Sequence, residues 1–253
     1  MPVRRSEVPE QRVVAVVQAR MTSTRLPGKV LADLCGRPML EQQLRRLAMS
    51  RAVDEFVIAT TENATDDPIC ALAKRLFVRC HRGSEDDVLS RVVDAARAAR
   101  ADVVVRVTAD CPLLDPGVVD DVVGALLSTP GCDYASNVLE RTHPRGLDVE
   151  AVRMDVLERV ATTATSPQAR EHVTWHIVRE DPSSFSMASV HEDDDNADLR
   201  WTVDTEDDLE LVRQIYAGLQ LGEQHKGYRE VLSWVRARPS LQRLNGHVLQ
   251  KHG

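Results

Sequence analysis

The chain has 253 residues, of which 43% are hydrophobic and 4% aromatic, and its formal net charge is −7. This apolar content excludes disorder as the main state, and the length allows one large α/β domain or two smaller domains. An acidic chain with few aromatic rings is a poor candidate for binding nucleic acid, because phosphates need a basic surface and bases need rings to stack on.

Targeting and redox features are few. No apolar run is long enough to cross a bilayer, and the run 13–17 after Arg4 and Arg5 is too short for a signal peptide. The five cysteines include no CxxC pair, which predicts reduced thiols and no metal ribbon. The sequence therefore predicts a cytoplasmic protein that does not bind membranes.

The first half of the chain alternates buried strand patterns with helical patterns. Strands are predicted at 12–18, 53–61, 76–80 and 102–107, and helices at 38–50, 66–75, 85–100 and 116–127. Ser84 and Asp87 have the N-cap and N3 spacing of a capping motif, and Asp115-Pro116 opens the fourth helix as a cap and a first-turn proline. This order predicts an α/β fold with a mostly parallel sheet flanked by helices, in which a ligand binds beyond the carboxyl ends of the strands.

The second half of the chain is less regular. Strand-like pieces occur at 133–136, 147–152, 185–190 and 200–203, and helical patterns at 153–162, 168–179, 206–219 and 226–237. We expect a single domain, 1–253, in which a core formed by about 12–130 and 200–253 is interrupted by an inserted subregion at about 130–200.

One loop after the first strand carries three cations. It has the sequence QARMTSTRLPGKVL (18–31), here called the basic loop, and it contains Arg20, Arg25 and Lys29. Cations at the end of a buried strand are costly without an anion, and hydroxyls and amides beside Gly28 can cradle phosphate oxygens. The loop matches neither the Walker A nor the GxGxxG pattern, and the alternative to a phosphate site is a solvated basic surface.

Two carboxylates follow strands at the same predicted edge. Asp110 comes directly after the strand 102–107, and Asp204 ends the piece 200–203. Asp208 fits a capping box with Thr205, whereas Asp110 and Asp204 have no evident structural task. Two carboxylates beside a basic loop predict a magnesium–nucleotide site, because Mg²⁺ shares hard oxygen ligands with phosphate.

The inserted subregion carries candidates for a second substrate. Asp148 and Glu150 alternate with apolar residues, so both carboxylates are expected on one side of a strand. Arg145, Arg170 and His172 could hold an anionic acceptor. Solvent-facing strand residues and local ion pairs remain the alternative for this group.

Two further patterns are read as structural. His172 and His176 are four residues apart in a helical pattern, but the HExxH order is absent, so structural histidines are favoured over a zinc site. The acidic run 193–195 fails the EF-hand pattern and is expected to be a solvated loop.

Taken in order, the motifs resemble the cytidylyltransferase family that includes the spore-coat polysaccharide biosynthesis protein F group and, more distantly, the CMP-acylneuraminate and CMP-KDO synthetases. The matching segments are QARMTSTRLPGKVL (18–31), RGSEDDVLSR (82–91), VRVTADCPLLDP (105–116), RGLDVEAV (145–152), REHVTWHI (170–177) and RWTVDTEDDLELV (200–212). The resemblance implies a nucleotidyltransferase fold of the glycosyltransferase-A-like, Rossmann-like type and a homodimer joined through the inserted subregion.

The resemblance also implies roles for single residues. Arg20, Lys29 and Asp110 would be catalytic, with Arg25 beside them at the triphosphate, and Mg²⁺ would be held by Asp110 and Asp204. The residues expected near the base and ribose are Ala19, Thr60, Arg82, Gly83 and Asp87.

The reaction that the resemblance implies is transfer of a cytidylyl group from CTP to an acidic sugar, a sugar phosphate or a phosphonate, with release of pyrophosphate, in polysaccharide biosynthesis. The alternatives are a nucleotidyltransferase that uses another nucleotide, a nucleotide-sugar-dependent glycosyltransferase, and a non-enzymatic nucleotide sensor. The glycosyltransferase is disfavoured because Asp110 is followed by Cys-Pro and not by the second aspartate of an Asp-x-Asp motif.

Overall fold

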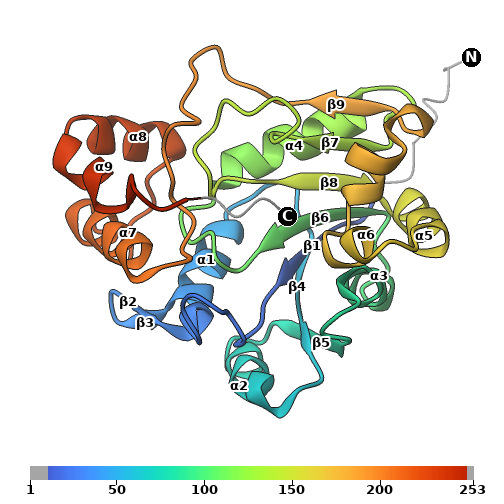
Figure 1. The fold of residues 1–253 in the computed structure, drawn as a ribbon, viewed down its shortest axis with the longest axis horizontal. Coiled ribbons are helices and arrows are strands. Elements are labelled where there is room, and N and C mark those ends of the chain that lie inside the picture. Colours follow the sequence, from blue (N-terminus) through green and yellow to red (C-terminus); the bar gives the residue numbers. More distant parts are fainter. Residues whose placement is uncertain (1–10, 250–253) are drawn as a thin grey trace, which may run out of the picture.

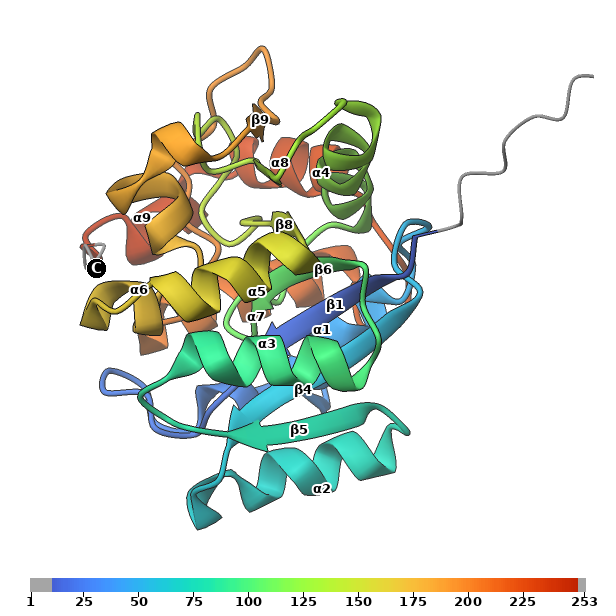
Figure 2. The ribbon, with the colours of Figure 1, turned by 90° about the vertical axis from the view of Figure 1, so that its right-hand side faces the viewer.

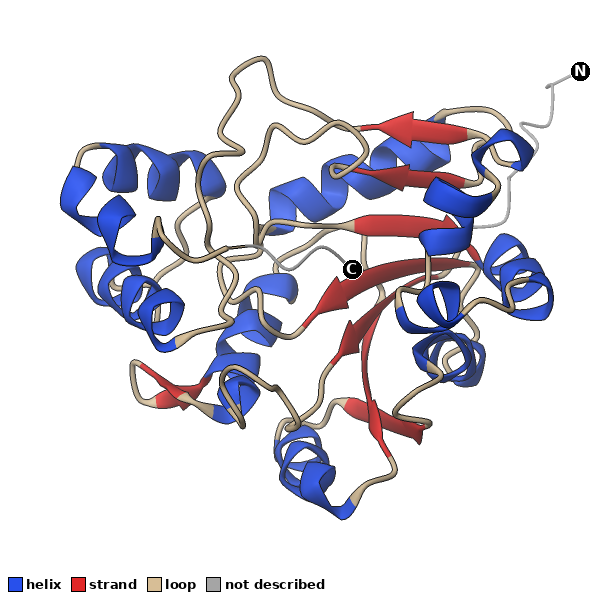
Figure 3. Ribbon diagram, viewed as in Figure 1, coloured by secondary structure: helices blue, strands red, loops and turns tan. Residues whose placement is uncertain are grey.

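Seven strands form one sheet through the centre of the protein, in the order β5-β4-β1-β6-β8-β7-β9 (Figures 1 and 3). The strands are β1 (Val13–Gln18), β4 (Glu55–Thr61), β5 (Arg79–Gly83), β6 (Val103–Thr108), β7 (Tyr134–Ser136), β8 (Glu150–Arg153) and β9 (Met187–Ser189). β5, β4, β1 and β6 are parallel, β8 runs antiparallel to β6 and β7, and β9 is parallel to β7. The computed structural model describes residues 11–249, so Arg4 and Arg5 lie outside the described part.

Helices cover both faces of the sheet (Figure 2). One face packs against α1 (Met39–Leu47), α2 (Asp67–Arg75) and α4 (Pro116–Ser128). The helices α7 (Glu206–Leu219), α8 (Tyr228–Arg236) and α9 (Pro239–Asn245) pack against one another and extend the same hydrophobic cluster. The other packs against α3 (Val88–Ala98), α5 (Met154–Thr163) and α6 (Pro167–Glu171). Successive residues of β1 enter the two cores alternately, which explains its uninterrupted apolar sequence.

The predicted fold class is confirmed: the structure is an α/β protein with a mostly parallel sheet between helices. Two of the three predicted caps are confirmed, since Asp115 accepts the amides of Gly117 and Val118 and Thr205 forms a capping box with Asp208. Strands β7, β8 and β9 come from residues 130–200 and extend the same sheet. Among residues 11–249, no helix has both the length and the apolar composition needed to cross a membrane.

Three predicted elements in the first half have a boundary that is wrong by about three residues. The helix predicted at 38–50 ends already at Leu47. The third strand is β5 at Arg79–Gly83, later than 76–80, because helix α2 ends in a turn at Phe77 whose φ is 56°. Helix α3 begins at Val88, later than 85, because the N-cap is Asp87, which accepts the amide of Ser90, while Ser84 only accepts the amide of Asp87.

Two predicted elements of the second half are also wrong. The piece 200–203 forms no strand: Arg200 makes one isolated bridge to Arg145, and Val203 bonds instead to Asp110. The helix predicted at 168–179 is broken into α6 and a π-helix, His176–Glu180, by Val173, whose φ is 49°. The sequence prediction missed helix α9, the two-residue strands β2 (Asp33–Leu34) and β3 (Arg37–Pro38), and the 3-10 turns.

Candidate functional site

The predicted phosphate and metal residues meet at the carboxyl edge of the sheet. They line one cavity of about 250 Å³, here called the central cavity, which includes Arg20, Arg25, Lys29, Asp110 and Asp204. They come from three segments: the basic loop after β1, the turn after β6 and the segment before α7. The topology therefore gathers in one cavity residues that are up to 184 positions apart, as a parallel sheet requires of its ligand edge.

The basic loop is closed on itself before it delivers Lys29. The amide of Gly28 donates to the carbonyl of Met21 at 2.9 Å, and Gly28 has a φ of 74°, a conformation that glycine adopts at low cost. The next residue, Lys29, begins a short 3-10 turn and is only 8% exposed. This turn points the ammonium away from bulk water and into the cavity wall.

Lys29 is held by both carboxylates. Its Nζ donates to Asp110 Oδ2 at 2.9 Å, to Asp204 Oδ1 at 2.8 Å and to the carbonyl of Val203 at 2.7 Å. Burial alone would lower the pKa of the ammonium, but Asp110 and Asp204 outweigh it and raise the pKa. Burial likewise favours a neutral Asp110, yet Lys29 and the Thr108 hydroxyl hold the pKa of that carboxyl below its usual value. Lys29 and Asp110 are therefore both charged at neutral pH.

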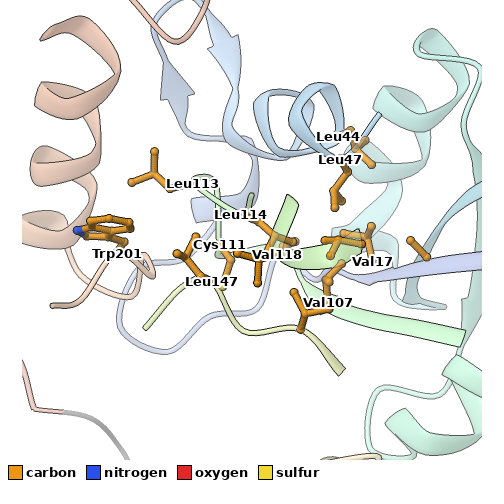
Figure 4. Close-up of a cluster of buried hydrophobic side chains, with 14 of the residues drawn as sticks. Val17, Leu44, Leu47, Val107, Cys111, Leu113, Leu114, Val118, Leu147 and Trp201 are labelled. Carbon is orange, nitrogen blue, oxygen red and sulfur yellow. The ribbon is translucent and has the colours of Figure 1, made fainter. Parts of the chain in front are cut away.

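Core packing of the segment 199–204 fixes the position of Asp204. Trp201 and Val203 are buried in the main hydrophobic cluster, where Trp201 lies near Leu113 and Leu147 (Figure 4). Thr202 and Asp204 alternate with these two buried residues and line a cleft at the surface, described below as the wider cleft. The segment thus presents a carboxylate to the cavity even though it is not a strand.

Asp204 is an ion-pair centre, contrary to the expectation that it has no structural task. Its Oδ1 accepts from Lys29, and its Oδ2 lies 2.8 Å from the Arg25 guanidinium and 2.6 Å from that of Arg200. Arg200 lies four residues before Asp204, whereas Arg25 lies 179 residues before it, so only the pair with Arg200 is local in the sequence. Asp204 thus contacts three cations, of which Lys29 is shared with Asp110 and Arg200 with Asp208.

Two acidic residues that the sequence analysis missed organise the other side of the basic loop. Glu85 accepts from the hydroxyl of Thr22 at 2.7 Å and lies 3.7 Å from Arg20. Asp66 accepts the amide of Met21 at 2.8 Å and is fully buried. The only sequence signal was that each is an acid near the end of a strand, which is not enough to distinguish it from a solvated loop residue.

The residues predicted near the base and ribose have partners within the protein. Thr60 is buried and donates to Asp66, and Arg82 pairs with Asp67. Gly83 packs against the Arg91 side chain, and Asp87 caps α3 and pairs with Arg170. Ala19 lies in the central cavity beside Arg20. Their roles in nucleotide binding stay predictions.

Three of the five predicted acceptor residues lie in a wider cleft that continues from the central cavity. Arg145, Asp148 and His172 line this cleft, which measures about 630 Å³ and also includes Asp110 and Asp204. Asp148 is clamped by Arg141 at 2.7 and 2.8 Å.

The other two predicted acceptor residues make internal contacts. Glu150 is buried, where it pairs with Arg106 and accepts from the hydroxyls of Tyr134 and Thr174. It still lines one cavity together with Asp148, as the strand alternation predicted. Arg170 pairs with Asp87 and lines a separate cavity beside Arg20.

The structure separates the two histidines and places the acidic run at the surface. His172 and His176 do not share a helix, because α6 ends at Glu171, and His176 pairs with Glu180. Asp193, Asp194 and Asp195 are exposed. Among residues 11–249, no cluster of three or more His, Cys, Asp or Glu side chains has the arrangement of a protein-only metal site.

Comparisons with known proteins agree with this architecture. The family model described as "Cytidylyltransferase" matches residues 14–231. The spore coat polysaccharide biosynthesis protein SpsF of Bacillus subtilis is 33% identical over 81% of this chain and 86% of its own length. The 3-deoxy-manno-octulosonate cytidylyltransferase of Geobacter sulfurreducens is 32% identical over 47% of this chain and 46% of its own. The solved structure of a cytidylyltransferase from Leptospira borgpetersenii superposes with a TM-score of 0.86 at 29% identity, covering 96% of this chain and 100% of that one.

Proposed function

The chain belongs to the cytidylyltransferase family, and from this premise we propose that it transfers a cytidylyl group from CTP to an anionic acceptor and releases pyrophosphate. The acceptor classes are an acidic sugar, a sugar phosphate and a phosphonate. The SpsF protein is named for spore-coat polysaccharide biosynthesis and the Geobacter protein for 3-deoxy-manno-octulosonate, which supports a sugar acceptor and a role in polysaccharide biosynthesis.

The observation that carries this proposal is that two carboxylates form ion pairs with the same side chain, Lys29. Asp110 and Asp204 each accept from the same ammonium at the bottom of a cavity that Arg20 and Arg25 also line. This arrangement suits a nucleoside triphosphate with its metal ion. The two carboxylates can bind the metal cation, and the neighbouring arginines can bind the phosphate oxygens.

The donor chemistry of the site fits Mg²⁺. Mg²⁺ in proteins binds through one or two carboxylates and completes its shell with water and substrate phosphates. Asp110 and Asp204 are close enough to share one cation, and the lowered pKa of Asp110 keeps that carboxylate ionised. These two residues would hold the ion, which would neutralise charge on the α-phosphate and the departing pyrophosphate.

The basic loop would supply the remaining electrostatic stabilisation. Arg20 is exposed, and its partner Glu85 is 3.7 Å away, so its planar fork is available to phosphate oxygens. Lys29 and Arg25 would exchange part of their contact with Asp204 for the triphosphate. The acceptor oxygen attacks the α-phosphorus in line, so the protein acts mainly by positioning the reactants and stabilising charge.

An anionic acceptor is supported by the Arg145 guanidinium. Within residues 11–249 no carboxylate pairs with this side chain, although it lines the wider cleft. Burial and the neighbouring cations Arg141 and Arg200 lower the pKa of Arg145, and the carboxylate of Asp148 compensates for them only in part. An acceptor carboxylate or phosphate in the cleft would provide that compensation.

The test is nucleotide binding measured by calorimetry, with CTP, UTP, ATP and GTP in the presence of Mg²⁺ and without an acceptor. We expect CTP to bind most tightly, because a pocket with small walls such as Ala19 excludes purines and backbone carbonyls distinguish the cytosine amino group from the uracil carbonyl. Pyrophosphate release is then measured with CTP against acidic sugars, sugar phosphates and phosphonates.

Variants connect the binding to the site. Asp110→Asn is expected to reduce turnover by about 10²–10³-fold. Asp121→Asn, an exposed carboxylate of α4, is the matched control and should turn over normally. Tighter binding of UTP or GTP would contradict the choice of CTP, and full turnover of Asp110→Asn at saturating Mg²⁺ would remove that residue from the site.

A further inference from the structure

We propose that Arg200, held in place by Asp208 and Asn245, is a positioning residue that fixes the Asp204 carboxylate for Mg²⁺–CTP. This inference rests on the proposed function, since Asp204 is there a metal ligand. Arg200 NH2 donates to Asp204 Oδ2 at 2.6 Å, and its Nε donates to Asp208 Oδ1 at 3.0 Å. One planar guanidinium therefore bridges two carboxylates, and only one of them faces the cavity.

Arg200 approaches Asp204 from outside the central cavity. Lys29 and Arg25, the other two cations on Asp204, line that cavity, whereas Arg200 lines a separate cavity beside α9. Substrate phosphates can therefore attract Lys29 and Arg25 without displacing Arg200. The contact from Arg200 is the one that can persist while the nucleotide is bound, and it would keep the carboxylate in one orientation.

Asp208 anchors the guanidinium. It is fully buried, and its Oδ2 accepts the amides of Asp204 and Thr205 at 2.9 and 3.0 Å. The same side chain thus fixes the backbone of Asp204 and the cation that holds the Asp204 side chain. This exceeds what a capping box needs, because the cap requires only the contacts with Thr205.

Asn245 ties this arrangement to the last described helix. Its Nδ2 donates to Asp208 Oδ1 at 2.8 Å and to the carbonyl of Arg200 at 3.0 Å, and the residue is buried. Helices α7 and α9, which carry Asp208 and Asn245, pack side by side (Figure 1). Asn245 consequently fixes both the main chain of Arg200 and its buried counterion without adding charge.

Residues that orient a metal ligand in this way usually matter for metal affinity. Loss of an outer partner of a metal ligand typically costs about 10–100-fold in affinity or activity. Lysine cannot replace Arg200, because its ammonium is a single point and lacks the planar fork that reaches two carboxylates at once.

The test compares CTP binding by calorimetry with and without Mg²⁺. The wild-type chain is expected to bind CTP more tightly when Mg²⁺ is present. We call the ratio of the dissociation constants without and with Mg²⁺ the Mg²⁺ gain. Arg200→Lys should lower this ratio about tenfold or more while leaving metal-free CTP binding unchanged. Asn245→Ala, which retains every charge, should change the gain in the same direction and by less. Arg243→Ala, an exposed residue of α9, is the control and should behave like the wild type.

The outcomes separate the two proposals. If the wild-type chain does not bind CTP, the proposed function fails whatever the variants do. If it binds CTP with a Mg²⁺ gain that both variants retain, only the positioning role is overturned. The inference is also overturned if a variant loses thermal stability but keeps the Mg²⁺ gain, or if both variants fail to fold. In either case the role of Arg200 is purely structural.

Discussion

Asp66 shows how one buried carboxylate can set the start of the basic loop. Its Oδ1 accepts the Met21 amide, and its Oδ2 accepts from Thr60 and from the amide and hydroxyl of Thr61. Burial by itself raises the pKa of Asp66, but the hydrogen bonds from Thr61, Met21 and Thr60 outweigh burial and lower it. The ionised form is therefore part of the folded structure.

We predict that Asp66→Asn lowers the free energy of unfolding by about 1–3 kcal/mol at pH 7, because an amide cannot accept all of these bonds. Asp66 has a lower pKa in the folded chain than the value of about 3.9 expected when unfolded. Its stabilisation is therefore complete above that unfolded value and is lost as the pH falls through the folded pKa. Urea unfolding at pH 7 and at a series of acidic pH values measures this.

The neighbouring Asp67→Asn is the control for this prediction. Asp67 is exposed and, among residues 11–249, forms an ion pair with Arg82 alone, so its loss should change the free energy of unfolding by less than about 1 kcal/mol. An Asp66→Asn effect that stays the same from pH 7 down to pH 3 would show that ionisation of the carboxylate is not the cause.

At the scale of elements, the junction between Arg145 and Arg200 joins the wider cleft to the segment that carries Asp204. The amide of Arg145 bonds to Leu199, and the amide of Trp201 bonds back to Arg145. Gly146 permits this close approach, since its φ is 103° and a Cβ there would lie 2.5 Å from the amide nitrogen of Thr202. Any side chain at this position would separate the two segments.

We predict that Gly146→Ala lowers the free energy of unfolding by at least about 1 kcal/mol and weakens CTP binding, because both the left-handed conformation and the contact with Thr202 oppose a side chain. Gly124→Ala is the matched control: Gly124 lies within α4 with open space around its Cα, so the change should raise stability by about 0.5–1 kcal/mol. Thermal and urea unfolding measure both, and a Gly146→Ala chain as stable as the wild type would refute the explanation.

Elements with a strong local signal could be predicted from sequence. The apolar run of β1 and the Asp115-Pro116 start of α4 were such cases. The break at Val173 was not, because the helical pattern continues across it. The break depends on contacts distant in the chain, such as the bond from Thr174 to Glu150.

The candidate site shows the same division. Position after a strand selected Asp110, and Asp204 was selected although the strand predicted before it is absent; both lie in one cavity with Lys29. The partners of each charge were not predictable, because they depend on strand register and tertiary packing. Glu150 is the clearest case: it lies opposite Arg106 in the β6–β8 register, and no spacing in the sequence specifies that pairing.

The oligomeric state of the whole molecule is still a prediction. The family resemblance implies contact between two copies through residues 130–200, and this segment ends the sheet with β9, an edge strand of three residues. We predict a two-fold symmetric homodimer. Light scattering at micromolar concentration should give about twice the chain mass of 28.2 kDa. A mass equal to that of one chain would contradict this prediction.

The pairing of Lys29 with Asp204 also has a consequence for the order in which the protein is made. The two residues are 175 positions apart, so a ribosome that adds about 5–20 residues per second produces the lysine roughly 10–35 s before its carboxylate partner. The strands β4, β5 and β6 and the first counterion, Asp110, are synthesised during that interval, and the ammonium then still lacks its second counterion. Closure of this edge is therefore a late event in biosynthesis, and it waits for the segment that precedes α7.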